Sequence, residues 1–208
     1  MTETKQERRF VAFDEVRVET DNDTGMKRIV GYAAVFDKLS EDLGGFRERV
    51  SKSAFDRTLK EGADVRALID HDPSKILGRN KAGTLKLNVE SKGLKTTIDM
   101  PGNTYAEDLV RSIDRGDVDG MSFGFITQTD DWELQDGETV RTLKDVDLFD
   151  VSVVTYPAYP DTSVALRSKD KATDHEKAKN ENADEDVKPA LNWKGKNRLK
   201  KTEVDLRA

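Results

Sequence analysis

The sequence predicts a β-rich α+β domain, in which a mostly antiparallel β-barrel, closed or nearly closed, is surrounded by a few helices. Three observations predict this fold class. About eight segments show the alternating or apolar pattern of strands, turn-forming residues separate them at short intervals, and only two segments have helical spacing. The chain therefore lacks the strand–helix–strand alternation of a parallel α/β fold.

The predicted strands are, in chain order, residues 9–19, 27–36, 65–70, 84–89, 94–100, 120–134, 139–155 and 162–167. Three clusters of turn formers, at residues 21–25, 91–93 and 135–137, divide six of these strands into consecutive hairpins. Residues 39–47 are expected to form a polar loop. The strand that ends at Asp70 runs into His71 and Pro73, and the proline predicts that His71 lies where this strand enters a loop.

Two helices are expected. The first covers residues 51–61, with Ser51 or Ser53 as its N-cap and with apolar side chains four residues apart on one face. The second begins at Thr104, which forms a capping box with Glu107, and continues to Gly116. Its apolar face comprises Ala106, Leu109, Val110 and Ile113.

The charge distribution divides the chain after Arg167. Overall 37% of the 208 residues are charged, but about half of residues 168–208 are. Such a segment buries too little apolar surface to offset its ordering entropy. We therefore expect a folded domain over residues 1–167 and a disordered or weakly helical tail over residues 168–208.

Composition excludes several classes of function. The net charge is −6 and the predicted domain is acidic, so the chain is a poor candidate for nucleic-acid binding. No apolar run is long enough to predict a membrane span or a signal peptide. The chain has no cysteine, which excludes disulfides, thiol nucleophiles and cysteine-based zinc sites. We expect a soluble, cytoplasmic protein without a cofactor or metal.

The scarcity of histidine restricts the candidate catalytic residues. The chain has two histidines, and only His71 lies in the predicted domain, whereas His175 lies in the tail. Ser122 lies in a Gly-x-Ser-x-Gly string, but a strand follows it, whereas a nucleophile elbow leads into a helix. Asp150 precedes an apolar run, so its carboxylate is expected to be half-buried and to need a partner such as an imidazole N–H. These three residues could form a Ser–His–acid arrangement.

Other interpretations of the same residues stay open. His71 could be a solvated loop residue, or it could bind a metal together with Asp70 and Asp72, although consecutive residues of an extended segment point to opposite sides. Ser122 could be a small strand residue between two glycines that mark a bulge or a close backbone approach. Asp150 could be an exposed charge at a sheet edge.

Six motifs occur together in an order that is similar to the HK97-like prohead maturation protease family, whose fold is related to herpesvirus assemblin. The resemblance covers about residues 10–167. The motifs are Gly31-Tyr-Ala-Ala-Val-Phe36, Ser53-Ala-Phe55, Leu68-Ile-Asp-His71-Asp72 with Leu77-Gly-Arg79, Ala82-Gly-Thr-Leu85, Gly116-Asp-Val-Asp-Gly-Met-Ser122-Phe-Gly-Phe125, and Asp150-Val-Ser-Val-Val-Thr-Tyr-Pro-Ala-Tyr159.

The resemblance implies an assemblin-like β-barrel and a serine endopeptidase. It assigns the nucleophile to Ser122, the base to His71 and the third member to Asp150. The family commonly has Glu at the last position, so the shorter Asp150 leaves Asp147 as an alternative acid.

The resemblance also implies a setting and partners. The enzyme would lie inside the phage procapsid in the bacterial host cytoplasm, cleave the scaffolding segment of the major capsid protein and process itself. It would associate with itself, as a dimer or another homo-oligomer. The tail could be a targeting arm that the enzyme trims. The competing hypothesis is an inactive capsid assembly or scaffolding protein that retains the fold.

Overall fold

The computed structural model describes residues 6–12 and 16–156, with only the main chain for residues 10–12. The predicted strand 162–167, the domain boundary after Arg167 and the predicted tail lie outside the described residues. The described strands are β1 (Glu7–Ala12), β2 (Arg17–Thr20), β3 (Lys27–Val35), β4 (Arg47–Val50), β5 (Arg66–Ile69), β6 (Asp72–Arg79), β7 (Leu85–Val89), β8 (Gly93–Asp99), β9 (Gly120–Gln135) and β10 (Glu138–Val154). The helical segments are α1 (Asp56–Lys60), the 3-10 turn η1 (Asn80–Ala82) and α2 (Thr104–Asp114).

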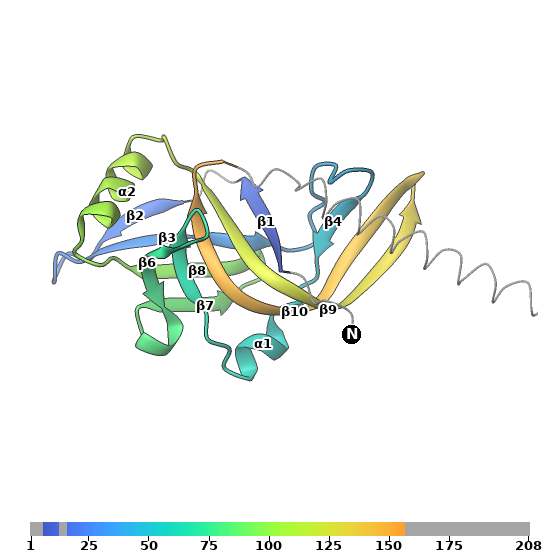
Figure 1. Ribbon diagram of the computed structural model, residues 1–208, viewed down its shortest axis with the longest axis horizontal. Helices are drawn as coiled ribbons and strands as arrows, with labels where there is room; N and C mark the ends of the chain where they lie inside the picture. Colours follow the sequence, from blue (N-terminus) through green and yellow to red (C-terminus); the bar gives the residue numbers. More distant parts are fainter. Residues whose placement is uncertain (1–5, 13–15, 157–208) are drawn as a thin grey trace, which may run out of the picture. The chain divides into compact units, whose positions relative to one another are not determined.

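The strands form two sheets (Figure 1). One has the order β1-β9-β10-β5-β6, with β4 also paired to β10, and the other has the order β2-β3-β8-β7. Pairing between the named strands is antiparallel except where β10 pairs with β4 and β5. The predicted β-rich α+β class is confirmed. The long curved pair β9 and β10 curls its sheet only into a partial barrel, and the strands remain in two separate sheets. The predicted closure of the barrel is therefore not reached in this part of the chain.

The hydrophobic core lies between the two sheets. Phe123 and Phe125 of β9 stack with ring centroids 4.9 Å apart, and Phe55 meets the Phe123 ring edge-on at 5.5 Å. Ile29 and Ile98 of the second sheet belong to the same fully buried cluster. Because side chains alternate along a strand, the face of β9 that carries Ser122 is opposite to this aromatic core.

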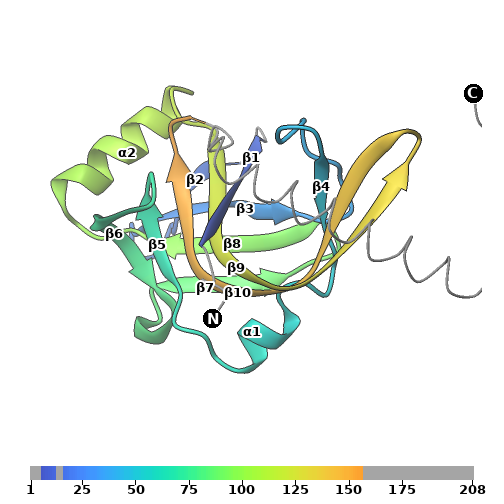
Figure 2. The ribbon, with the colours of Figure 1, turned by 45° about the vertical axis from the view of Figure 1, so that its right-hand side comes forward.

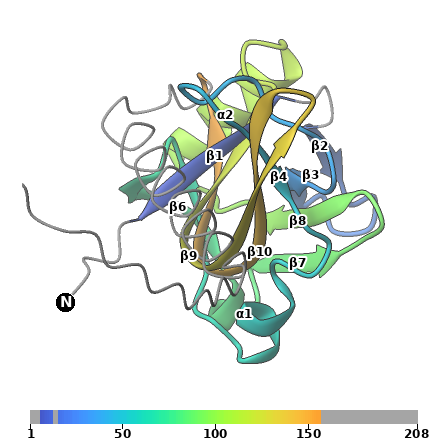
Figure 3. The same ribbon diagram turned by 90° about the vertical axis from the view of Figure 1, so that its right-hand side faces the viewer.

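A buried ionic cluster joins β1 and β4 to the β9–β10 hairpin, whose far end faces the viewer in Figure 3. Arg141 donates to Glu7 at 2.7 Å, to Glu48 at 3.0 Å and to Asp130 at 2.7 Å, while Arg9 donates to Glu48 at 2.6 Å. Burial acts to raise the pKa of Glu7, but the hydrogen bonds and charge of Arg141 outweigh it and lower the pKa to about 2. Sequence patterns gave no sign of this cluster.

The first predicted strand, residues 9–19, is wrong as a single element. It consists of β1, which pairs with β9, and β2, which pairs with β3 in the other sheet. Residues 10–13 are an apolar run and residues 16–19 alternate, and neither pattern reveals the change of sheet. The hairpin predicted between residues 27–36 and the strand before them is confirmed, and it consists of β2 and β3.

Both predicted helices exist, but both predicted N-caps are wrong. α1 begins after Phe55 without a side-chain cap, because residues 51–54 form turns instead of helix. α2 is capped by Asn103, whose side chain accepts from the Ala106 N–H at 3.1 Å. Thr104 is therefore the first helical residue, and its predicted capping box with Glu107 is wrong, because the cap lies one residue earlier.

The apolar face predicted for α2 is buried, and Gly116 follows the helix with a φ of +79°. The predicted hairpins β7–β8 and β9–β10 are confirmed. Two strands were not predicted: β4 directly follows the polar loop, and β6 directly follows His71. No helix of the described residues is long and apolar enough to cross a membrane.

Candidate active site

The pairing of β9 with β10 places three polar side chains on one face of the sheet. A bulge at Phe149 shifts the register, so that Asp150 lies opposite Gly124 and Ser152 lies opposite Ser122. Residues that face each other across an antiparallel ladder project to the same side. The bulge therefore brings Asp150 to the side of the sheet that carries Ser122, away from the aromatic core.

The absence of a side chain at Gly124 leaves room for the Asp150 carboxylate. A Cβ atom built on Gly124 would overlap the Asp150 carboxylate and would lie 2.8 Å from the Phe149 ring. Real Cβ atoms do not approach neighbours so closely, so any larger residue at this position would displace the acid. The second glycine of the Gly-x-Ser-x-Gly string thus marks a close approach of the Asp150 carboxylate to the β9 backbone. A close backbone approach at these glycines was one of the interpretations that the sequence left open.

His71 lies in a tight hairpin turn between β5 and β6. Pairing extends to Ile69 and Asp72, which leaves Asp70 and His71 as a two-residue turn with φ angles of +50° and +56°. Positive φ at both central residues is typical of two-residue hairpins, and Asp and His adopt it more readily than most side chains. His71 does follow the end of a strand, as predicted, but the predicted loop is only a two-residue turn, and β6 begins at Asp72. Pro73 does not prevent pairing because β6 is an edge strand.

The parallel pairing of β5 with β10 brings this turn to the end of β10 (Figure 2). The Asp70 N–H donates to the Val153 carbonyl at 3.0 Å, and the Asp70 carboxylate accepts from the Thr155 N–H at 2.8 Å. Both bonds come from Asp70, and they hold the turn against the end of β10. Because β5 and β10 are far apart in sequence, strand patterns alone did not predict this parallel contact.

The three residues form a continuous chain of hydrogen bonds. His71 Nε2 lies 2.6 Å from Ser122 Oγ, and His71 Nδ1 lies 2.5 Å from Asp150 Oδ1. Ser122 is fully buried, while His71 and Asp150 keep 8% and 6% of their surfaces exposed. A hydroxyl, an imidazole and a carboxylate in this order form the arrangement that makes a serine hydroxyl nucleophilic.

A fourth polar side chain, Ser152, contacts two members of this chain. Its hydroxyl donates to Asp150 Oδ1 at 3.0 Å and lies 3.3 Å from His71 Nδ1. It also accepts from the His71 main-chain N–H at 3.3 Å. Sequence reasoning missed Ser152, although its position two residues after Asp150 on a strand was a usable signal.

Asp147, the alternative acid, binds elsewhere. Its carboxylate accepts from Arg57 at 2.5 Å and from Gln128 at 2.6 Å, and its side chain is 45% exposed. Hydrogen bonds to Asp145 and Asp147 raise the pKa of the Arg57 guanidinium. The structure brings Asp150, and not Asp147, to the imidazole.

The proposed metal ligands Asp70, His71 and Asp72 do not converge. Asp70 binds Thr155, whereas the Asp72 carboxylate accepts from the Ser74 N–H at 2.9 Å and from its hydroxyl at 2.7 Å. Within the described ranges, no group of three or more His, Cys, Asp or Glu side chains is placed to hold a metal ion. These residues instead stabilise the turn and the start of β6.

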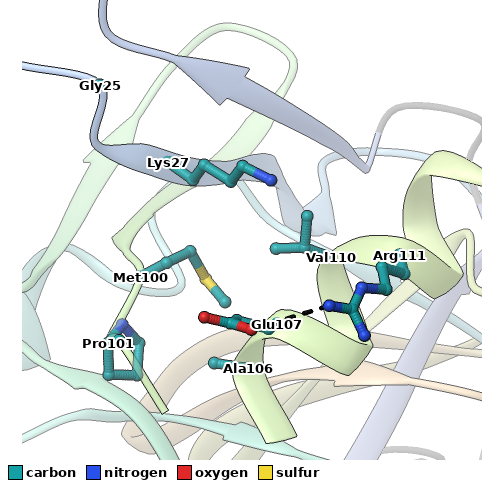
Figure 4. Close-up of a pocket in the computed structure, with 9 residues that line it drawn as sticks. Gly25, Lys27, Met100, Pro101, Ala106, Glu107, Val110 and Arg111 are labelled. Carbon is teal, nitrogen blue, oxygen red and sulfur yellow. Dashed lines mark ion pairs between the residues drawn. The ribbon is translucent and has the colours of Figure 1, made fainter. Parts of the chain in front are cut away.

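A separate pocket of about 450 Å³ lies between the start of β3 and α2 (Figure 4). It contains none of the three hydrogen-bonded residues. Met100, Ala106 and Val110 give it an apolar wall, and Glu107 and Arg111 form an ion pair of 3.8 Å beside it. The pocket therefore has no part in the chemistry of the candidate site.

Comparisons with known proteins give the family. The prohead protease of Enterobacteria phage HK97 is 28% identical over 157 residues, which cover 74% of this chain and 66% of that protein. The solved bacteriophage T4 capsid assembly protease is similar with a TM-score of 0.49 and 10% identity, covering 72% of this chain and 98% of that chain. The model of the caudovirus prohead serine protease family matches residues 14–178, well over half of the sequence. The chain belongs to the caudovirus prohead serine protease family, as its six motifs predicted.

Proposed function

We propose that this protein is a serine endopeptidase that uses Ser122, His71 and Asp150 as its catalytic triad. The observation that carries the proposal is the hydrogen-bonded chain from Ser122 Oγ through both nitrogens of His71 to Asp150. Membership in a serine protease family supports the same chemistry.

Each residue has one role in this mechanism. Ser122 Oγ attacks the scissile carbonyl while His71 Nε2 takes its proton, and His71 then returns a proton to the leaving amine. Asp150 accepts from Nδ1–H, so it keeps the proton off Nε2 before the reaction and stabilises the imidazolium afterwards. Water repeats the same proton transfers to release the acyl group.

The substrate we propose is the scaffolding segment of a major capsid protein, cut inside the procapsid in the host cytoplasm. The name of the HK97 relative, a prohead protease, supports this setting. We also propose that the enzyme processes itself and acts as a dimer or another homo-oligomer. We further propose that active protein trims residues 168–208 and that Ser122→Ala protein retains them, a difference that intact-mass spectrometry detects.

The burial of Ser122 adds a requirement to this mechanism. A hydroxyl with no exposed surface cannot meet a peptide carbonyl until the neighbouring structure opens. The structure therefore corresponds to a closed state of the proposed enzyme. The same burial is the observation that favours the second candidate, an inactive assembly protein that retains the fold.

Coexpression with the cognate capsid protein, followed by mapping of the cut site by mass spectrometry, tests the proposal. We expect Ser122→Ala and His71→Ala to abolish cleavage and Asp150→Ala to leave residual activity. His175→Ala is the matched control, since it removes the other histidine and should change nothing. Full cleavage by Ser122→Ala protein would refute the assignment.

A fluorophosphonate probe separates the remaining alternatives. Labelling on Ser122, lost in His71→Ala, is expected for the proposed enzyme. Inhibition of cleavage by a chelator, without any labelling, would instead favour a metal-dependent hydrolase. Neither labelling nor cleavage in the presence of assembled capsid protein would favour the inactive assembly protein.

A further inference from the structure

We propose that Ser152 is a positioning residue of the catalytic triad, which fixes Asp150 and His71 relative to each other. This inference rests on the proposed function and adds a residue to it. Ser152 lies on β10 directly opposite Ser122 and two residues after Asp150. It therefore belongs to the same face of the sheet as the nucleophile and the acid.

The bonding capacity of a hydroxyl decides how Ser152 can act. A serine hydroxyl has one proton to donate and two lone pairs to accept with. The Ser152 proton goes to Asp150 Oδ1 at 3.0 Å, so toward His71 the oxygen can only accept, and it accepts from the main-chain N–H at 3.3 Å. One side chain thus ties the carboxylate to the backbone of the residue that carries the imidazole.

This tie acts beside the bulge that carries the acid. Asp150 follows the bulge at Phe149, and the carboxylate lies over Gly124, which has no side chain to pack against it. The two donors that we identify on Asp150 Oδ1 in the described part of the chain are His71 Nδ1 and Ser152 Oγ. Without Ser152 the carboxylate could rotate away from the imidazole, because the remaining bond comes from the group that it has to orient.

Burial makes the tie strong. Ser152 has no exposed surface, so water cannot replace its hydroxyl, and a hydrogen bond to a carboxylate is stronger than one between neutral groups. The Asp150 carboxylate thereby gains a second fixed contact besides the imidazole. The geometry assigns to Ser152 the orientation of the acid and not a contact with substrate.

A double-mutant cycle tests this role in the full-length protein, with cleavage of the capsid protein as the assay. We expect Ser152→Ala to lower kcat about tenfold while KM changes less than about twofold, because the acid is misaligned but substrate binding is untouched. In an Asp150→Ala background, Ser152→Ala should cost less than about twofold more, since the group it positions is gone.

A merely structural role predicts a different cycle. Equal losses from Ser152→Ala in the two backgrounds, or a rise in KM as large as the fall in kcat, would overturn the proposal. Thr96→Val is the matched control, because it removes another fully buried hydroxyl, on β8, away from the triad, and it should leave kcat unchanged.

Two further measurements keep the test decisive. If Ser152→Ala is unfolded at the assay temperature, Ser152→Cys takes its place in the cycle, because a thiol has similar size but donates only weakly. Ser122→Ala in the same assay distinguishes a failure of the proposed function from a failure of the proposed role of Ser152. Cleavage by Ser122→Ala would overturn the proposed function, whereas an inactive Ser122→Ala with equal losses in both backgrounds would overturn only the role of Ser152.

Discussion

Replacing Gly124 by alanine should disable the proposed triad without touching any of its members. The added methyl group would occupy the position of the Asp150 carboxylate and press on the Phe149 ring. Both neighbours belong to a bulged strand in the interior of the sheet, so neither can withdraw freely. Overpacking of this kind costs about 1–3 kcal/mol of unfolding free energy.

The catalytic effect should exceed the effect on stability. Displacing the acid by about 1 Å removes its bond to His71, and misplacements of this size lower rates by about a hundredfold. We therefore expect kcat/KM of Gly124→Ala to fall about a hundredfold, and no further than in Asp150→Ala. The assay is initial-rate cleavage of the capsid protein, with thermal unfolding measured on the same preparations.

Gly102→Ala is the control for this experiment. A Cβ on Gly102 meets no atom within 4 Å, and the residue does not have a positive φ, so the substitution should be neutral in both assays. Cleavage by Gly124→Ala at the wild-type rate would show that the added methyl group does not disable the triad. A structure of this variant with Asp150 Oδ1 still in contact with His71 Nδ1 would show that the acid is not displaced.

The remaining predictions concern the buried ionic cluster, an unpaired hydroxyl and the histidine turn. The pKa of Glu7 is lowered to about 2, so its contribution, on the order of 3 kcal/mol, is complete above its ordinary pKa of 4.5 and is lost as the pH falls toward 2. Urea unfolding between pH 5 and pH 2 should show this loss in wild type and a flatter profile in Glu7→Gln, and parallel profiles would contradict it. Thr96 Oγ1 has no hydrogen-bond partner in the described residues, so Thr96→Val should raise the unfolding free energy by about 1 kcal/mol, and a lower melting temperature would argue against this. Asp70→Gly keeps the positive φ of the turn but removes the bonds of the Asp70 carboxylate to Thr155. We expect kcat to fall about tenfold with KM nearly constant, because His71 is less firmly placed. Unchanged kinetics would show that the turn holds His71 without these bonds.

Local patterns predicted most elements of the fold. Alternation and turn formers located the hairpins β7–β8 and β9–β10, because a hairpin depends on residues that are adjacent in sequence. The same patterns could not predict that β4 and β5 pair in parallel with β10, since that choice depends on distant residues. They also could not separate β1 from β2, because the sheet that a strand joins depends on distant residues.

The candidate site was predictable in part. Scarcity of histidine and the family resemblance both pointed to His71, Ser122 and Asp150, and the structure brings these three together; their catalytic role stays a prediction. The choice between Asp147 and Asp150 depends on the single extra residue at Phe149, and a bulge has no reliable pattern in a sequence.

The parallel strands around β10 have a consequence for how this protein folds. The base and the acid are separated by 79 positions, and the turn that carries His71 has its partner in the last described strand. Domains dominated by such non-local pairing fold slowly, because long loops must close before the non-local contacts form. During synthesis, the His71 hairpin leaves the ribosome well before β10 does, so Ser122, His71 and Asp150 cannot all be in contact until β10 has been made. The order of translation itself therefore delays the assembly of the proposed triad.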